Sequence, residues 1–227
     1  MSVRFRFIVV EGGEGSGKST QARLLGEALE KLGEEVLLTF EPWDTAAGKA
    51  IRTMLLDVPA RLTTLTEVFL FCADRAQHVS EVIRPALAAG KIVISDRYET
   101  STWVYQGYAG GVGVEEVEKL NEVATGGLHA DLTIILDLDP IVGLARAGRL
   151  SEREQARARK GKGIARQAAL PHLISDRLEA RELEYHRLVR EGYLAWAQAH
   201  ADVSAVFDAT LAPEELHRHI LERVLSG

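Results

Sequence analysis

Short apolar runs alternate with amphipathic stretches along the chain. Each run contains four to six mostly aliphatic residues in which Val and Ile are frequent. Runs of this length are typical of strands buried on both faces, and the stretches between them carry apolar residues at helical spacing. The pattern predicts an α/β fold in which helices connect parallel strands. The expected strands cover residues 5–10, 35–40, 91–96, 132–137 and 203–208, and the expected helices cover residues 18–32, 46–56, 64–89, 115–124, 176–200 and 213–225.

The composition is that of an ordinary globular protein, with 227 residues of which 46% are apolar and 26% are charged. A chain of this length buries a sizeable core, so we expect one domain over residues 1–227. The single cysteine, Cys72, excludes an internal disulfide and favours a reducing compartment. The run at 5–10 is too short for a signal peptide, and no run approaches the roughly 18 apolar residues of a membrane span. We therefore expect a cytoplasmic protein without membrane contact.

Charge is distributed unevenly along the sequence. The net charge of −6 argues against binding to nucleic acid. Residues 151–175 nevertheless carry six basic and two acidic side chains, and expected helices flank them. We interpret the region at about 146–176 as a lid-like insertion. For residues 157–166 we favour a solvated charged segment over a binding role.

A glycine-rich loop directly follows the first expected strand. It reads Gly12-Gly13-Glu14-Gly15-Ser16-Gly17-Lys18-Ser19 and matches G-x-x-x-x-G-K-[ST] between a strand and a helix. Such a loop points backbone N–H groups at phosphates, its lysine reaches the β- and γ-phosphates, and its hydroxyl residue holds Mg²⁺. The alternative is a glycine-rich turn with a fortuitous lysine. The expected ATP site comprises Gly12, Gly13, Gly15, Ser16, Gly17, Lys18, Ser19 and Thr20.

Several further motifs occur together with this loop. They are Glu41-Pro42, the segment LFCADRAQHV at 70–79, Asp96-Arg97-Tyr98, the segment STWVYQG at 101–107, Asp137-Leu138-Asp139-Pro140 and Asp176-Arg177-Leu178-Glu179. From residue 7 to about residue 193 the chain thus resembles the bacterial thymidylate kinases. The resemblance implies a P-loop nucleoside monophosphate kinase fold, with a five-stranded parallel sheet and helices on both faces. It also implies transfer of a phosphoryl group from MgATP to dTMP, giving dTDP, and a homodimer.

The resemblance assigns the base of dTMP to Phe71 and Arg75. These residues are four apart on an expected helix, so their side chains lie one above the other. An aromatic plane beside a guanidinium suits a base that needs stacking and a hydrogen-bond donor. From the residues alone, Phe71 in the core and Arg75 in a surface ion pair would be an equally good interpretation.

Other roles follow from the resemblance alone. Arg97 is expected to bind the substrate phosphate and Asp96 to organise Mg²⁺ through water, although Asp96 could instead serve a structural ion pair. Glu14 is expected to accept a hydrogen bond from the 3′-hydroxyl, or else to point to solvent. Tyr105 is expected to exclude a ribose 2′-hydroxyl. The remaining residues expected to bind substrate are Glu41, Pro42, Ser101, Thr102 and Gln106. Taken singly, Thr102, Tyr105 and Gln106 could each equally be an ordinary helix residue.

The lid is expected to supply cations, because Gly13 to Ser16 contain no basic residue. Arg146, Arg149 and Arg153 are the candidates for contact with ATP, and Arg149 is the one we expect to touch its phosphates. With Lys18, Arg97 and Glu14, Arg149 completes the expected catalytic set.

One loop departs from the family pattern. The family commonly has R-E-P-G-G-T where this chain reads Phe40-Glu41-Pro42-Trp43-Asp44-Thr45. The change removes an arginine and two glycines, and we expect Arg52 to supply the missing phosphate contact. The altered loop leaves open a kinase for another nucleoside monophosphate. A regulator that binds ATP without turnover is the alternative from a different class.

Overall fold

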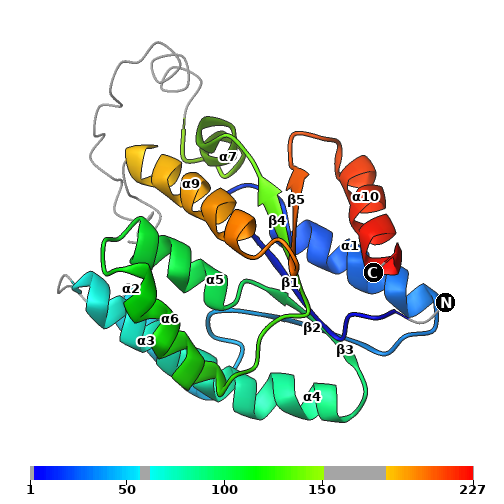
Figure 1. Cartoon of the computed structure of the whole chain (residues 1–227), viewed down its shortest axis with the longest axis horizontal. Helices are drawn as coiled ribbons and strands as arrows, with labels where there is room; N and C mark the ends of the chain where they lie inside the picture. The colour runs from blue at the N-terminus through cyan, green and yellow to red at the C-terminus, as the bar shows by residue number, and fades with distance from the viewer. Residues whose placement is uncertain (1–2, 57–61, 151–182, 227) are drawn as a thin grey trace.

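Five parallel strands form the centre of the molecule, in the order β2-β3-β1-β4-β5. The computed structural model describes residues 3–56, 62–150 and 183–226. The predicted α/β class with a five-stranded parallel sheet is confirmed, and helices cover both faces of the sheet (Figure 1). The strands are β1 (Phe7–Gly12), β2 (Val36–Phe40), β3 (Ile92–Asp96), β4 (Leu132–Asp137) and β5 (Ser204–Asp208). The helices are α1 (Lys18–Lys31), α2 (Ala46–Leu56), α3 (Thr64–His78), η1 (Val79–Ile83), α4 (Arg84–Ala88), α5 (Glu99–Thr102), η2 (Trp103–Tyr108), α6 (Val114–Thr125), α7 (Pro140–Arg146), α9 (Leu183–Ala199) and α10 (Pro213–Ser226).

The central strand β1 divides its side chains between two cores. Ile8 and Val10 face α1 and α10, whereas Phe7 and Val9 face η1 and α4. Successive side chains of a strand point to opposite faces, so a strand covered on both sides must be apolar throughout. This requirement explains the unbroken apolar runs in the sequence.

Strand register places the chemistry at one edge of the sheet. Val10 pairs with Asp96 of β3, and Gly12 pairs with Leu136 of β4. The loop after β1, the Asp96-Arg97 pair and Asp137 therefore emerge side by side at the carboxyl ends of the strands. In open parallel sheets this edge is where ligands bind.

The helices differ from the expected ones in three places. The run predicted over 64–89 is continuous, but Val79–Ile83 has π-helical hydrogen bonding between α3 and α4. Residues 99–108 form the short helices α5 and η2, and residues 140–146 form α7, none of which the periodicity indicated. Among the described helices, none is long and apolar enough to cross a membrane. Residues 151–182, which include most of the expected lid, lie outside the described part of the chain.

His129 joins two helices at the surface of the molecule. Its Nδ1 lies 2.9 Å from Glu99 of α5, and its Nε2 lies 3.1 Å from Glu122 of α6. The hydrogen bond to Glu99 is the main reason that the pKa of His129 is raised to about 9. A raised histidine pKa stabilises the folded state fully below the unfolded value near 6.5, and this contribution is lost as the pH rises through 9.

We therefore expect His129→Ala to lower stability at pH 6 and to have little effect at pH 10. The side chain is 55% exposed, so the loss at pH 6 should be at most about 1 kcal/mol. Urea unfolding at the two pH values measures the effect. The control is His219→Ala, which removes an exposed histidine on α10. An equal loss at both pH values would contradict the ion-pair explanation.

Candidate active site

The loop after β1 folds around its own backbone. Gly15 and Gly17 have φ values of +68° and +94°, which only glycine adopts without strain. Lys18 Nζ donates to the carbonyl oxygen of Gly13 at 2.9 Å, and Ser16 Oγ donates to the same oxygen at 2.8 Å. The loop thus leads from β1 into the N-terminus of α1, which is the context the sequence pattern requires, and the Lys18 side chain folds back over the loop.

Helix α7 lies directly against this loop. A Cβ atom at Gly15 would lie 2.1 Å from the carbonyl oxygen of Gly143, and one at Gly143 would lie 2.2 Å from that of Glu14. Two backbones can approach this closely only because both positions are glycine. The contact brings the base of the expected lid to the loop.

Glu14 is paired with an arginine from beyond α7. Arg149 Nε donates to Glu14 Oε1 at 3.1 Å, while Glu14 Oε2 is buried and has no hydrogen-bond partner among the described residues. Burial raises the pKa of Glu14, and the charge of Arg149 opposes the rise. The expected solvent-pointing alternative for Glu14 is therefore wrong, because its carboxyl group points into the site.

Two oxygen-bearing side chains meet where Mg²⁺ is expected. Ser19 Oγ donates to Asp96 Oδ2 at 2.5 Å, joining the start of α1 to the end of β3. Hydroxyl and carboxylate oxygens are the ligands that Mg²⁺ prefers. These residues fit a magnesium ion, which Ser19 and Asp96 would hold.

Arg97 is held in a strained backbone conformation directly after β3. Its φ is +75°, which is costly for a residue with a side chain. Its Nη1 lies 3.0 Å from Ser101 Oγ and 3.4 Å from the Tyr193 hydroxyl, and its guanidinium carbon lies 5.1 Å from the centre of the Tyr105 ring. These contacts fix the guanidinium beside the phosphate loop, where it can bind an anion.

The buried carboxylate of Glu11 organises the surroundings of Arg97. This side chain is 0% exposed. Its Oε1 accepts from the backbone N–H groups of Tyr98 and Ser101 at 2.9 and 3.0 Å. Its Oε2 accepts from Ser101 Oγ at 2.7 Å and from the Tyr193 hydroxyl at 2.8 Å. Burial raises the pKa of Glu11, and the charge of Arg97 counteracts this rise.

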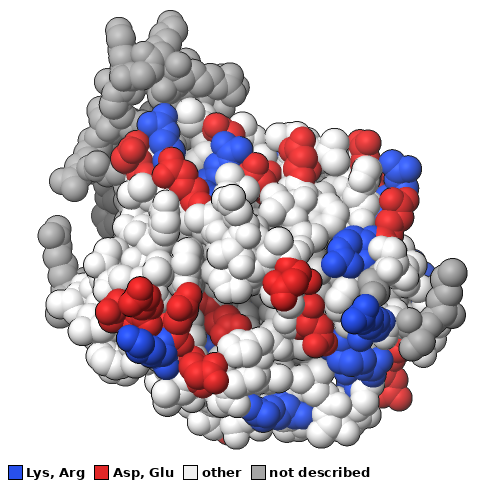
Figure 2. Space-filling model, in the orientation of Figure 1, with Lys and Arg blue, Asp and Glu red and all other residues white. Residues whose placement is uncertain are grey.

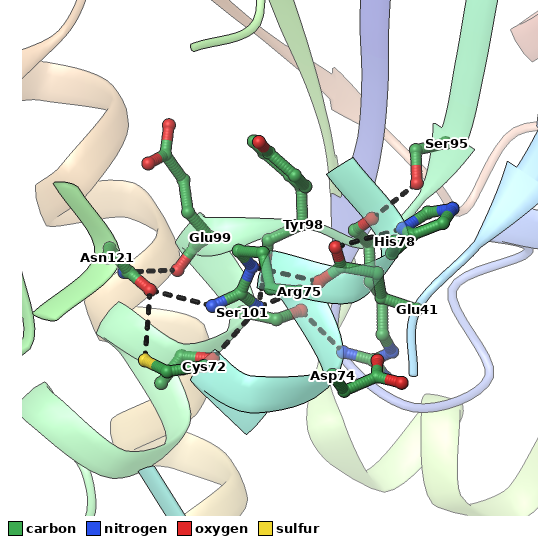
Figure 3. Close-up of polar contacts among 12 residues, drawn as sticks. Glu41, Cys72, Asp74, Arg75, His78, Ser95, Tyr98, Glu99, Ser101 and Asn121 are labelled. Atoms are coloured by element: carbon green, nitrogen blue, oxygen red, sulfur yellow. Dashed lines mark hydrogen bonds and ion pairs between the residues drawn. The ribbon is translucent and has the colours of Figure 1, made fainter. Parts of the chain in front are cut away.

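Arg75 lies at the centre of a buried polar cluster (Figure 3). It is 2% exposed and forms an ion pair with Glu41 at 2.8 Å. Its Nη1 donates to Asn121 at 2.6 Å, and its Nη2 donates to the Tyr98 carbonyl and to Thr102 Oγ1, both at 3.1 Å. The alternative of a surface ion pair is wrong, because the pair exists but is buried.

Phe71, which is expected to hold the base together with Arg75, lies closer to the surface. Phe71 is only partly buried and is not a member of a buried core cluster, so the alternative that assigned it to the core is wrong. Thr102, Tyr105 and Gln106 are all buried on the neighbouring α5 and η2. The structure thus places the expected pocket residues on two adjacent helices.

The loop that departs from the family pattern keeps a conformation suited to glycine. Trp43 stands where the family commonly has glycine, and its φ is +81°. Both carboxylate oxygens of Asp74 accept from the Trp43 backbone N–H at 3.1 Å, and burial raises the pKa of Asp74 to about 6. The guanidinium carbon of Arg52 lies 3.6 Å from the centre of the Trp43 ring. Arg52 therefore has a stacking partner, a contact that the sequence did not indicate.

The remaining cations divide between two locations. Arg146 donates to the carbonyl oxygen of Ala209 at 2.9 Å, in the loop after β5. Arg190, which was not predicted, makes two hydrogen bonds to Asp137 at 2.6 and 2.8 Å and lines a small pocket with Glu14. Arg153 lies outside the described residues.

Comparison with known proteins identifies the family. The family model described as thymidylate kinase matches residues 10–220. The chain belongs to the thymidylate kinase family. The thymidylate kinase of Maridesulfovibrio salexigens is 43% identical over 220 residues, covering 96% of this chain and 94% of its own length. That of Solidesulfovibrio magneticus is 45% identical over 209 residues, covering 92% of this chain and 93% of its own.

A solved member of the thymidylate kinase family has the same fold. The crystal structure of thymidylate kinase from Ehrlichia chaffeensis superposes with a TM-score of 0.72 at 27% identity, covering 96% of this chain and 97% of that one. The agreement extends over nearly the full length of both chains. The sequence resemblance to thymidylate kinases is therefore confirmed.

We expect Glu11→Gln to destabilise the protein by about 2–3 kcal/mol, because an amide N–H would face groups that all donate to the carboxylate. We also expect the KM for dTMP to rise, because Ser101 and Tyr193 would no longer hold Arg97. Urea unfolding and steady-state kinetics measure the two effects. Glu27→Gln, in an exposed pair with Arg23, is the control and should change stability by less than about 0.5 kcal/mol. Wild-type stability and KM in the Glu11 variant would refute the role of this carboxylate.

Proposed function

We propose that this protein transfers the γ-phosphoryl group of MgATP to dTMP, forming dTDP and ADP, as its family membership indicates. One observation carries the assignment of the site. The register of β1 with β3 pairs Val10 with Asp96, so the phosphate loop and Arg97 leave the sheet side by side. A donor and an acceptor phosphate bound at these two places would meet between them.

The donor half of the proposed site is the loop over Gly12–Thr20. Its backbone N–H groups and Lys18 bind the phosphates of ATP. Ser19 and Asp96 are the residues that would hold Mg²⁺. When bound, the ion neutralises charge on the transferring phosphoryl group. Arg149 adds a cation at the same place once its carboxylate partner, Glu14, is engaged by the acceptor.

The acceptor half lies between α3 and the helices that follow β3. Arg97 binds the 5′-phosphate and Glu14 accepts from the 3′-hydroxyl. Phe71 stacks on the base and Arg75 donates a hydrogen bond to it. Arg75 Nη1 carries two N–H groups, and because Asn121 accepts from one of them, the other can donate to the base. The remaining residues of the proposed pocket are Glu41, Pro42, Arg52, Ser101, Thr102, Tyr105 and Gln106.

The protein supplies positioning and charge rather than a covalent intermediate. Phosphoryl transfer needs the attacking oxygen held in line with the γ-phosphorus and the developing charge neutralised. Lys18, Arg97 and Arg149 deliver positive charge from three separate segments. We assign Arg146, which reaches the loop after β5, to the nucleoside side of ATP. Arg153, which lies outside the described residues, is assigned to the lid as a further candidate for contact with ATP.

We also propose a cytoplasmic homodimer that binds neither nucleic acid nor membrane. Exposed apolar side chains on neighbouring helices support the dimer: Met54 on α2 and Leu65 and Phe69 on α3. A net charge of −6 argues against nucleic acid. On the face drawn in Figure 2, acidic and basic side chains of the described residues are interspersed rather than gathered into a basic stripe.

We expect Lys18→Ala to lower kcat for dTMP phosphorylation by about 10²-fold or more, because it removes a cation from the phosphate site. The fold should persist, since Lys18 lies at the start of α1 and its Nζ donates to the Gly13 carbonyl oxygen of the loop rather than packing in a hydrophobic core cluster. A coupled assay for ADP measures turnover, and circular dichroism checks the fold. Lys31→Ala, at the far end of α1, is the matched control. Near-normal turnover in the Lys18 variant would contradict the mechanism.

We expect dTMP to be the best acceptor in a panel that includes dUMP, dCMP and dGMP. The family membership indicates dTMP, and the proposed pocket offers an aromatic face and a donor for a base carbonyl, where cytosine carries an amine at C4. The measurement is kcat/KM for each monophosphate at saturating MgATP. A tenfold preference for another monophosphate would overturn the substrate assignment, and ATP binding without acceptor-stimulated ADP release would overturn the enzyme assignment.

A further inference from the structure

Helix α3 is joined to α5 at one end of the proposed base pocket and to η2 at the other. Glu67, Phe71 and Arg75 are spaced four residues apart, so they share one face of α3. Arg75 reaches Thr102 at 3.1 Å at one end of this face. Glu67 reaches Gln106 at 3.2 Å at the other end. The two contacts bracket Phe71, which is the aromatic face proposed for the base.

The contact with Glu67 fixes which way the Gln106 amide points. A carboxylate only accepts hydrogen bonds, so the Gln106 group that faces it is the Nε2 donor. Gln106 is 2% exposed and Glu67 is 7% exposed. Turning the amide around would place two acceptor oxygens together in this buried site, which is costly. The Gln106 carbonyl oxygen therefore points away from Glu67.

That oxygen is available to a ligand. Within the part of the chain that the structure describes, no group donates to Gln106 Oε1, although Nε2 is engaged. An amide oxygen in a pocket accepts an N–H from whatever binds there. Arg75, on the same face of α3, offers only donors. Arg75 and Gln106, on either side of Phe71, thus present one hydrogen-bond donor and one acceptor to a ligand.

This combination matches one class of pyrimidine. A 2,4-dioxopyrimidine such as thymine or uracil carries a carbonyl at C4 beside an N–H at N3. Cytosine reverses both groups, with an amine at C4 and an acceptor at N3. A donor from Arg75 and an acceptor from Gln106 pair with the first arrangement and oppose the second. A site with buried polar groups rejects a mismatched ligand strongly, because those groups are left unpaired.

We propose that Glu67 is a positioning residue that locks the Gln106 amide and thereby makes the pocket selective for dioxopyrimidines over aminopyrimidines. This inference rests on the proposed function, since it requires the base to bind between α3 and the helices α5 and η2. Glu67 acts through Gln106 and makes no contact with the substrate itself. Its carboxylate, rather than its size, is the feature that matters.

The test is Glu67→Gln, which keeps the shape of the side chain but lets it donate as well as accept. The Gln106 amide can then present either end to the base. We expect the ratio of kcat/KM for dTMP to that for dCMP to fall by about tenfold or more. The KM for ATP should stay within about twofold, because the donor half is untouched. A ratio unchanged within threefold in a folded variant would overturn the proposal.

Glu81→Gln is the matched control. Gln77 donates to Glu81 on an exposed stretch beyond the pocket, so the same pair of side chains loses the same charge there. We expect its dTMP to dCMP ratio to equal that of the wild type. An equal fall in both variants would assign the effect to general charge loss and would also overturn the proposal.

Glu67→Asp covers the case in which the glutamine variant does not fold. Aspartate still only accepts hydrogen bonds, so this variant should keep the dTMP to dCMP ratio within about threefold of the wild type, and a larger loss in the folded variant would contradict the proposal. The wild-type assay separates this inference from the proposed function. If the wild type does not phosphorylate dTMP, the function fails. If it does and Glu67→Gln leaves selectivity intact, only the inference about Glu67 fails.

Discussion

The buried carboxylate of Glu11 is the constraint on which the geometry of the site depends. It sits on β1, one residue before the phosphate loop begins, and is fully enclosed. A buried charge is costly unless its oxygens are satisfied, so the surrounding chain must supply donors. Those donors come from the start of α5 and from α9. Through these hydrogen bonds, the strand that leads into the phosphate loop also fixes the segment that carries Arg97.

In the half of the site proposed to bind dTMP, a second buried carboxylate likewise fixes an arginine by hydrogen bonds. Glu41, at the end of β2, pairs with Arg75 and contacts His78 at 3.1 Å. Buried ion pairs contribute little net stability, because desolvation offsets their attraction. Their value here is geometric, since each hydrogen bond restricts where the guanidinium can lie. The same reasoning applies to Asp74, which holds Trp43 in a backbone conformation that suits glycine.

The fold and the position of the phosphate loop between a strand and a helix could be predicted because their signals are local. Apolar runs mark strands buried on both faces, and the glycine spacing of the phosphate loop is readable from consecutive residues. The helices at 99–108 were missed because they are short and carry no clear apolar stripe. The roles of Glu11, Asn121 and Tyr193 were missed because their partners are distant in sequence. Tyr193 meets Glu11 across 182 positions, which no local pattern reveals.

Two residues expected in the substrate site have surroundings that the sequence did not indicate. The resemblance assigned Arg75 to the base of dTMP, and the structure buries it in a network that only tertiary packing creates. Arg52 was expected to replace a lost arginine, and the Trp43 that accompanies that loss is the residue that holds it. Such contacts depend on where loops fold back, which sequence spacing does not specify.

The most direct measurement is a crystal structure of the protein with dTMP and a non-hydrolysable ATP analogue. The account predicts the 5′-phosphate of dTMP on the Arg97 guanidinium, the thymine ring beside Phe71 and the γ-phosphate at Lys18. The reacting oxygen and phosphorus should then lie about 3–3.5 Å apart. A thymine ring bound elsewhere, or a dTMP phosphate that does not contact Arg97, would contradict it.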